Sequence, residues 1–210
     1  MLECYIETFL LYHHSCFIPK NGYNSRIMLK NFVNFVWETL KIVFLALVIV
    51  LPIRYFIFQP FIVKGQSMEP NFQQGNYLII DELSYRLRDP ERGEVIVFKY
   101  PYNPSQRYIK RIIGLPGETV EIKDQRVKIF DNQGEEMILK ENTYLPEGDL
   151  TLGNTRLTLK EDEFFVLGDN RLSSSDSRAW GVLPRTNIIG KVLFRLWPIQ
   201  EASEIIAPNY

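Results

Sequence analysis

The chain has 210 residues, with 24 Lys and Arg against 25 Asp and Glu, so its formal net charge is −1. This length fits one membrane segment and a single globular domain with a proper core, and the balanced charge provides no field for attracting nucleic acid. Both histidines and both cysteines lie among the first sixteen residues, so the rest of the chain has no disulfide, no thiolate nucleophile and only a poor zinc site. We therefore predict no nucleic-acid partner, no metal and no cofactor.

Residues 1–31 show neither the periodicity of a helix nor the alternation of a strand. The adjacent His13 and His14 have no further ligand at metal-binding spacing, so we interpret this segment as a solvated tail. Met28 stands just before the apolar stretch that follows. Translation that starts at Met28 is therefore an alternative, which N-terminal sequencing of the native protein would test.

An apolar stretch at residues 32–58 predicts one membrane-spanning helix. Its uncharged centre, residues 42–53, is shorter than the roughly 20 residues that cross a bilayer, and extension back to residue 32 supplies the length. Glu38 and Lys41 lie three positions apart and so share a helix face. A cleaved signal peptide is the alternative, but no small-residue cleavage pattern follows the apolar run. Basic residues are slightly more frequent before the span, which favours a cytoplasmic tail and an extracytoplasmic domain.

From residue 59 onward, short β-branched and aromatic runs alternate with Gly, Pro and Asn, and no long helical periodicity appears. We predict a mainly β domain, a partly open antiparallel barrel-like fold over residues 59–210. The polar, turn-rich residues 124–160 predict a smaller inserted lobe. The strand candidates are residues 76–81, 94–100, 107–113, 119–123, 126–131, 164–169 and 188–196.

Ser67 and Lys110 are candidates for a catalytic pair in a domain that has no histidine. A serine hydroxyl needs a base, and a lysine serves only when burial lowers its pKa well below about 10.4. Strand alternation places Lys110 on the face of Tyr108 and Ile112, which gives the amine apolar neighbours. Taken alone, Ser67 is equally well an ordinary loop serine, and Lys110 a half-exposed strand lysine.

Four segments, taken together and in this order, are far more specific than either residue. They resemble the conserved boxes of type I signal peptidases, membrane-anchored serine proteases of peptidase family S26 that remove signal peptides from exported proteins. The resemblance extends from about the anchor to Arg195 and includes the single preceding span. The four segments are VKGQSMEP (63–70), RGEVIVFKYP (92–101), YIKRIIGLPGE (108–118) and GDNRLSSSDSRAWG (168–181).

The resemblance implies roles for residues at matching positions. It makes Ser67 the nucleophile, with its backbone amide binding the oxyanion, and Lys110 the general base. The hydroxyl that supports the lysine falls on Ser174, although the run of Ser173, Ser174 and Ser175 leaves this choice dependent on the alignment. The remaining residues of the last box are expected to be structural or to shape the pocket wall: Asp169, Asn170, Arg171, Asp176 and Arg178.

This sequence departs from the family pattern in two places. Leu172 and Ser173 stand where many members have Asp-Asn. Gly65 stands where some members carry a serine that helps to bind the oxyanion. A second oxyanion donor therefore remains to be found, because one lost donor typically costs about 2.7 to 4 kcal/mol of transition-state stabilisation.

The expected function is removal of N-terminal signal peptides at small-x-small sites through an acyl-enzyme, with preprotein signal peptides and the lipid bilayer as partners. The expected location is the cytoplasmic membrane, with the domain on the extracytoplasmic side; a thylakoid membrane is the alternative. Two other readings remain open: a self-cleaving repressor-type serine-lysine peptidase, and a membrane-tethered β module that only binds partners. The anchor argues against the first, and the presence of both Ser67 and Lys110 against the second.

Overall fold

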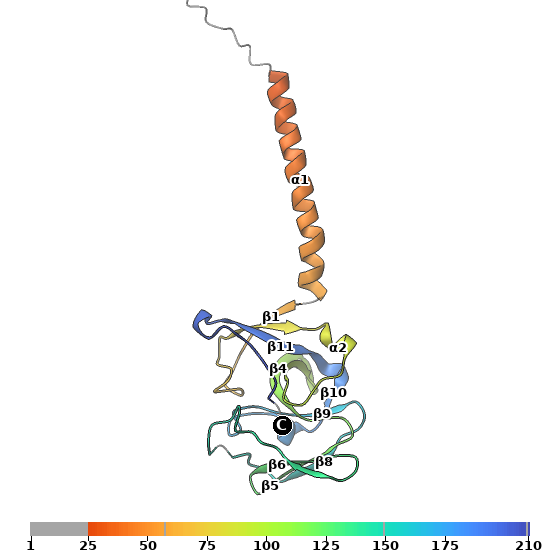
Figure 1. The fold of residues 1–210 in the computed structure, drawn as a ribbon, viewed down its shortest axis with the longest axis vertical. Coiled ribbons are helices and arrows are strands. Elements are labelled where there is room, and N and C mark those ends of the chain that lie inside the picture. The colour runs from red at the N-terminus through yellow and green to blue at the C-terminus, as the bar shows by residue number, and fades with distance from the viewer. Residues whose placement is uncertain (1–24, 57, 149, 209) are drawn as a thin grey trace, which may run out of the picture. The chain divides into compact units, whose positions relative to one another are not determined.

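The computed structural model describes residues 25–56, 58–148, 150–208 and 210 (Figure 1). The chain divides into two compact units, Met1–Ile49 and Val50–Tyr210. The paired histidines and both cysteines of the predicted tail lie outside the described residues.

Helix α1, Ser25–Phe56, is the first described element. Its segment Met28–Leu51 has 24 residues with a mean hydropathy of 2.0, and is long and apolar enough to cross a bilayer. Every side chain of this segment is exposed, and the Lys41 ammonium lies 2.8 Å from the Glu38 carboxylate on one helix face. The helix begins before residue 32, where the apolar pattern predicted the start of the anchor. A lipid-facing helix explains such exposed apolar surface, as expected for a membrane-anchored protein.

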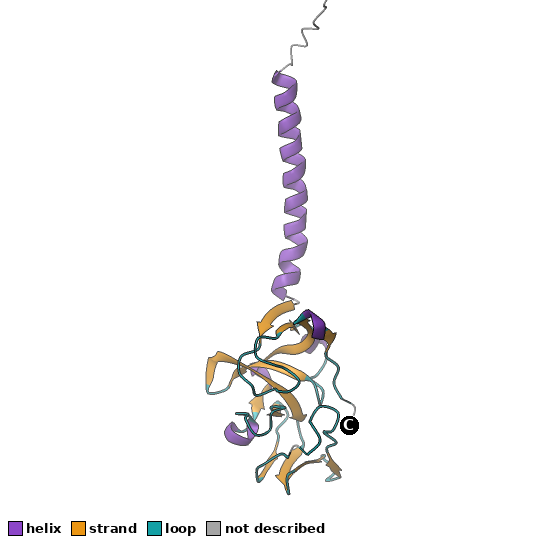
Figure 2. Ribbon diagram, turned by 90° about the vertical axis from the view of Figure 1, so that its left-hand side faces the viewer, coloured by secondary structure: helices purple, strands orange, loops and turns teal. Residues whose placement is uncertain are grey.

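The larger of two antiparallel sheets has the strand order β1-β2-β11-β3-β4-β9-β10, with β12 beside β11. Within the described residues the sheet curls but does not close into a barrel, so β1 and β10 form its two ends (Figures 1 and 2). Its strands are β1 (Phe58–Ile62), β2 (Tyr77–Asp81), β3 (Val95–Tyr100), β4 (Asn103–Gly114), β9 (Glu163–Leu167), β10 (Leu183–Pro184), β11 (Ile188–Trp197) and β12 (Ser203–Glu204).

The smaller sheet has the order β7-β6-β5-β8 and lies at the end of the domain away from β1 in both views (Figures 1 and 2). Its strands span residues 119–158, which overlaps the predicted lobe but starts earlier. Its strands are β5 (Thr119–Lys123), β6 (Arg126–Phe130), β7 (Glu136–Ile138) and β8 (Thr155–Thr158). The helical turns of the domain are α2 (Ser84–Leu87), α3 (Ser177–Trp180), η1 (Arg185–Asn187) and η2 (Ile199–Glu201).

Alternating side chains of these strands form the core, as the period-two pattern requires. One buried cluster lies within the curl of the larger sheet and includes Val95, Val97 and Ile109, which follow one face of β3 and β4. All seven strand candidates are confirmed, although several ends shift by one or more residues. Strand β1 was not among the candidates, because its sequence continues the apolar run of the anchor. The short strands β7, β8, β10 and β12 were also missed, because two to four residues are too few to show a pattern.

Candidate active site

Ser67 lies in a loop that is closed at its base. The Val63 N–H donates to the Asn76 carbonyl at 3.0 Å, and the Gly75 N–H donates to the Val63 carbonyl at 3.0 Å. Met68, next to Ser67, is 0% exposed and packs in the core of the larger sheet. Burial of this side chain fixes the position of the neighbouring Ser67.

Lys110, in the centre of β4, meets Ser67 across the curl of the sheet. Its Nζ lies 2.6 Å from Ser67 Oγ and 2.9 Å from the Ile109 carbonyl oxygen. The side chain is nearly enclosed, since the residue is 3% exposed and Nζ lies 5.5 Å from the centre of the Tyr108 ring. Burial lowers the pKa of Lys110 from 10.5 to about 8, even though the more distant Asp176 and Asp169 act to raise it. The structure thus brings together the two residues that the sequence singled out.

The segment that begins at Gly168 lies directly against the Ser67 loop. The Asn170 N–H donates to the Ser67 carbonyl at 3.1 Å, and the Asn170 side-chain amide donates to the Gln66 carbonyl at 3.1 Å. A methyl group on Gly168 would overlap both the Ser67 carbonyl oxygen and Ser174 Oγ. Glycine is needed at this position because two chain segments approach each other so closely.

Asp169 anchors this segment through a buried ion pair with Arg111. The Arg111 Nε and Nη2 donate to the two Asp169 oxygens at 2.9 and 2.6 Å, and the side chains are 5% and 0% exposed. The Asn71 amide also donates to Asp169, at 2.8 Å, and so joins the far end of the Ser67 loop to the same carboxylate. Sequence reasoning missed Arg111 and Asn71. The signal for Arg111 was its position between Ile109 and Ile113 on a face that the alternation pattern places in the core.

Two further ion pairs support the same segment from the other side. Asp176 accepts from the Gly168 N–H at 3.1 Å and binds the Arg178 guanidinium through two contacts of 2.8 Å. The Arg171 guanidinium binds Glu141 at 2.8 and 2.5 Å and donates to the Gly168 carbonyl at 3.1 Å. Glu141 had no signal in the sequence, because it lies thirty positions from its partner in the poorly patterned lobe.

A hollow of about 180 Å³ opens beside the Ser67 hydroxyl; we call it the Ser67 hollow. Its walls include Phe61 of β1, Tyr108 and Ile109 from β4, and Ser173 and Ser175. The predicted wall residues Asp169, Asn170 and Arg171 are not among the residues that line it. Their polar atoms instead form the hydrogen bonds and ion pairs that hold the Ser67 loop. These residues therefore support the hollow without forming its wall.

The three consecutive serines differ in their surroundings. Ser173 and Ser175 are exposed and line the Ser67 hollow, whereas Ser174 Oγ is buried beside Gly168. Within the described residues Ser174 Oγ has no hydrogen-bond partner, and no hydrogen bond joins it to Lys110. Ser174 is thus the enclosed hydroxyl of the three.

The backbone before Ser67 is open toward the hollow. Gly65 has a φ of +84°, a left-handed conformation that glycine adopts without strain, and a side chain at this position would meet open space. Within the described residues no carbonyl accepts a hydrogen bond from the Ser67 N–H. That amide can therefore donate to an oxygen that enters the hollow. Among all the residues that the structure describes, no group of three or more His, Cys, Asp and Glu side chains could hold a metal ion.

Comparisons with known proteins agree on one family. The sequence profile of the family described as "Signal peptidase, peptidase S26" matches residues 36–197. The chain is 38% identical to a signal peptidase I of Leptolyngbya laminosa, over 81% of this chain and 84% of the relative. It is 33% identical to signal peptidase IB of Staphylococcus aureus, over 78% of this chain and 91% of the relative. A crystal structure of a signal peptidase I from Enterococcus faecalis aligns over 50% of this chain and 97% of that one, with 33% identity and a TM-score of 0.41.

The fold is mainly β, a buried lysine amine contacts a serine hydroxyl, and the profile match gives the family. The chain belongs to the signal peptidase family, peptidase S26. It is accordingly a serine endopeptidase of the class that removes signal peptides, with one apolar N-terminal helix consistent with membrane anchoring.

Proposed function

We propose that this chain cuts signal peptides from preproteins at small-x-small sites, with Ser67 as the nucleophile and Lys110 as the general base. The observation that carries the proposal is the 2.6 Å contact between Ser67 Oγ and a buried lysine amine. Burial lowers the pKa of this amine to about 8, so a substantial fraction of it is neutral near physiological pH. A neutral amine has a free electron pair and can accept the serine proton.

The first half of the reaction forms an acyl-enzyme. Ser67 Oγ attacks the scissile carbonyl carbon while its proton passes to Lys110 Nζ, and the carbonyl oxygen becomes an oxyanion that the Ser67 N–H stabilises. The Lys110 ammonium then returns its proton to the leaving amine as the C–N bond breaks. The mature protein leaves with a free amino terminus, and the signal peptide stays esterified to Ser67.

In the second half, water takes the place of the serine. Neutral Lys110 accepts a proton from the water as its oxygen attacks the ester carbonyl carbon. The tetrahedral intermediate then collapses, the C–O bond to Ser67 breaks, and the lysine proton returns to Ser67 Oγ. The signal peptide leaves with a free carboxyl group, which releases its remaining proton to solvent, and both residues regain their starting protonation states.

The residues around Ser67 and Lys110 position these two side chains. The ion pairs of Asp169 and Asp176 and the hydrogen bonds of Asn170 hold the Ser67 loop against β4. We assign Ser174 as the positioning partner of Lys110. The support is its buried hydroxyl, which has no hydrogen-bond partner among the described residues and packs beside the Gly168 that also touches the Ser67 carbonyl.

Substrate recognition follows from the place of the hollow. Strand β1 is the end strand of the larger sheet, and the chain that leaves it for Ser67 forms one wall of the Ser67 hollow. An extended peptide can add to such an edge through main-chain hydrogen bonds, and its alternate side chains then point to the same surface. The limited volume, about 180 Å³, favours small side chains next to the scissile bond.

The proposed location is the cytoplasmic membrane, with α1 as a retained anchor and the catalytic domain on the extracytoplasmic side. The support is the apolar segment Met28–Leu51 together with the slight excess of basic residues before it. Protease accessibility of the domain in sealed vesicles of known orientation tests the side. Protection from protease added outside right-side-out vesicles would contradict it.

Cleavage of a preprotein with an Ala-x-Ala site tests the proposal. We expect Ser67→Ala and Lys110→Met to abolish cleavage, while Ser203→Ala, at an exposed residue that does not line the Ser67 hollow, serves as the control and retains it. Circular dichroism and thermal unfolding establish that each variant is folded. Cleavage at the wild-type rate by either Ser67→Ala or Lys110→Met would contradict the assigned chemistry.

A further inference from the structure

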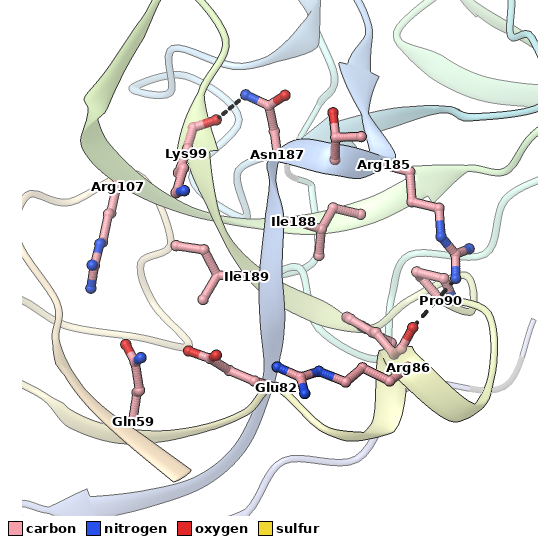
Figure 3. A pocket seen from close by; sticks show the side chains of 12 residues that line it. Gln59, Glu82, Arg86, Pro90, Lys99, Arg107, Arg185, Asn187, Ile188 and Ile189 are labelled. Carbon is pink, nitrogen blue, oxygen red and sulfur yellow. Dashed lines mark hydrogen bonds between the residues drawn. The ribbon is translucent and has the colours of Figure 1, made fainter. Parts of the chain in front are cut away.

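A second hollow of about 410 Å³ lies at one end of the curl of the larger sheet (Figure 3). Four basic side chains from separate elements surround it, and we call it the cationic hollow: Arg86 of α2, Lys99 of β3, Arg107 of β4 and Arg185 of η1. Its floor includes Ile188 and Ile189 of β11. Nothing in the peptidase reaction uses these four cations together.

Two of the cations face each other across the sheet. Lys99 and Arg107 are register partners in the antiparallel β3–β4 ladder. Like charges directly opposite each other destabilise such a pair, unless an opposite charge lies nearby. Both side chains continue the row of Val95, Val97 and Ile109 out of the core toward solvent. The sheet therefore places two positive charges side by side at its open end.

The charges of the cationic hollow are not balanced from within. Within the described residues, Arg86, Lys99 and Arg107 have no carboxylate within 4.0 Å, whereas Arg185 binds Asp89 at 2.5 Å. Glu82 is the acidic residue that lines the hollow; its Oε1 is enclosed without a hydrogen-bond partner. Burial raises the pKa of Glu82, and Arg86, Arg107 and Lys99 oppose this rise. Within the described residues, the hollow thus holds one carboxyl group and three cations that have no carboxylate partner. Its net positive charge suits an anion.

The covalent chain ties this hollow to the anchor. Gln59, which lines it, follows the last residue of α1, Phe56, by three positions. Three residues of extended chain span at most about 11 Å, so covalent geometry alone keeps Gln59 within this distance of Phe56. Anionic lipids attract basic side chains within about 8 Å of the membrane surface at physiological salt, the distance over which charge is screened.

We propose that the cationic hollow binds the phosphate of an anionic lipid headgroup. Arg86, Lys99 and Arg107 supply charge-assisted hydrogen bonds to the phosphate oxygens, and the two isoleucines contact the glycerol carbons. Arg107 also lines the Ser67 hollow, so a bound headgroup would lie beside the catalytic cleft. The inference rests on the membrane anchor of the proposed function, and is independent of the chemistry of Ser67 and Lys110.

The test uses the full chain carrying Ser67→Ala, in lipid discs of phosphatidylcholine alone or with added phosphatidylglycerol. Hydrogen exchange of the α2 amides reports occupation of the hollow. We expect protection in the anionic discs, which the double variant Arg86→Gln/Lys99→Gln reduces about 25-fold, since each cation near an anionic surface contributes a factor of about five. The matched control is Lys123→Gln/Arg126→Gln, two exposed cations of the β5–β6 hairpin, which leaves the protection unchanged.

Equal protection in both kinds of disc, or protection that survives the double variant, would overturn the proposal. Inorganic phosphate and a soluble acidic peptide, each added to phosphatidylcholine discs, test whether the hollow binds another anion. Full protection of the α2 amides by inorganic phosphate, with none from phosphatidylglycerol, would assign the hollow to a free anion. Protection of these amides by a soluble acidic peptide alone would assign the hollow to the substrate. Because the tested chain lacks the nucleophile, failure here leaves the peptidase proposal standing, and the reverse also holds.

Discussion

Lys110 and Arg111 are neighbours in β4, are equally buried at 3% and 4% exposure, and have opposite surroundings. Arg111 meets both oxygens of Asp169 and remains charged, with its pKa raised by that carboxylate despite burial. Lys110 meets a serine hydroxyl and a backbone carbonyl, and burial lowers its pKa to about 8. The comparison shows that burial alone does not decide the role of a cation. The partner decides whether a buried cation keeps its charge, as Arg111 does beside Asp169, or has a lowered pKa, as Lys110 does beside a hydroxyl and a carbonyl.

The largest expected effect comes from making position 110 permanently charged. A guanidinium has a pKa above about 12, so Lys110→Arg cannot supply a neutral base. We expect kcat/KM for an Ala-x-Ala preprotein to fall by about 10²- to 10⁴-fold, the usual contribution of general base catalysis. The exposed Lys123→Arg is the control and should cleave like wild type. Full activity of Lys110→Arg would mean that a group other than Lys110 is the base.

The second-largest effect is expected from removing the carboxylate that pairs with Arg111. Asp169→Asn leaves the buried guanidinium without a counter-charge, which typically costs about 3–5 kcal/mol. We expect the free energy of unfolding, measured by urea denaturation, to fall by this amount. Asp124→Asn, at an exposed hairpin residue with φ of +51° that Asn tolerates, should have almost no effect. Similar stabilities for the two variants would show that the ion pair is not what holds this segment.

A third prediction concerns stability against pH. The pKa of Lys110 is about 8 in the folded chain against 10.5 for an ordinary lysine, so the unfolded chain binds more protons between these values and wild-type stability rises with pH there. Below pH 8 the folded chain carries the full free-energy cost of burying a protonated Lys110. Lys110→Met removes it, and should be more stable than wild type at pH 7 by up to about 3 kcal/mol.

This advantage of Lys110→Met should shrink as the pH rises toward 10. The comparison uses urea denaturation of both chains at each pH. Lys123→Met, at an exposed lysine, should show no such pH-dependent difference from wild type. An advantage that stays constant from pH 7 to 10 would mean that Lys110 titrates normally.

The smallest effect distinguishes the three serines. If Ser174 orients the Lys110 amine, Ser174→Ala should lower kcat by about 10- to 100-fold, the value of one hydrogen bond to a charged group. Ser173→Ala and Ser175→Ala, at residues that line the Ser67 hollow, should change KM and keep the wild-type kcat, and the exposed Ser203→Ala, away from the hollow, is the control. A purely structural role would instead lower the stability of Ser174→Ala with kcat unchanged.

The seven strands that were predicted carry a local pattern of β-branched and aromatic residues. Lys110 lies on a strand face with Tyr108 and Ile112, and this pattern already indicated apolar neighbours. The contacts of Asp169 with Arg111 and of Arg171 with Glu141 were not predictable. Each joins residues far apart in the chain, and neither local alternation nor propensity carries information about such a partner.

By itself, the sequence determined the apolar stretch and the β class of the domain, and it singled out Ser67 and Lys110 as candidates for a catalytic pair. These follow from composition and short-range periodicity, which act along the chain. Only the tertiary structure decided that the Ser67 loop lies against β4, and that Lys110 is left without the carboxylate that its neighbour receives. The physical reason is that the pKa of a side chain depends on burial and on nearby charges. Both are set by segments that come together only when the sheet folds.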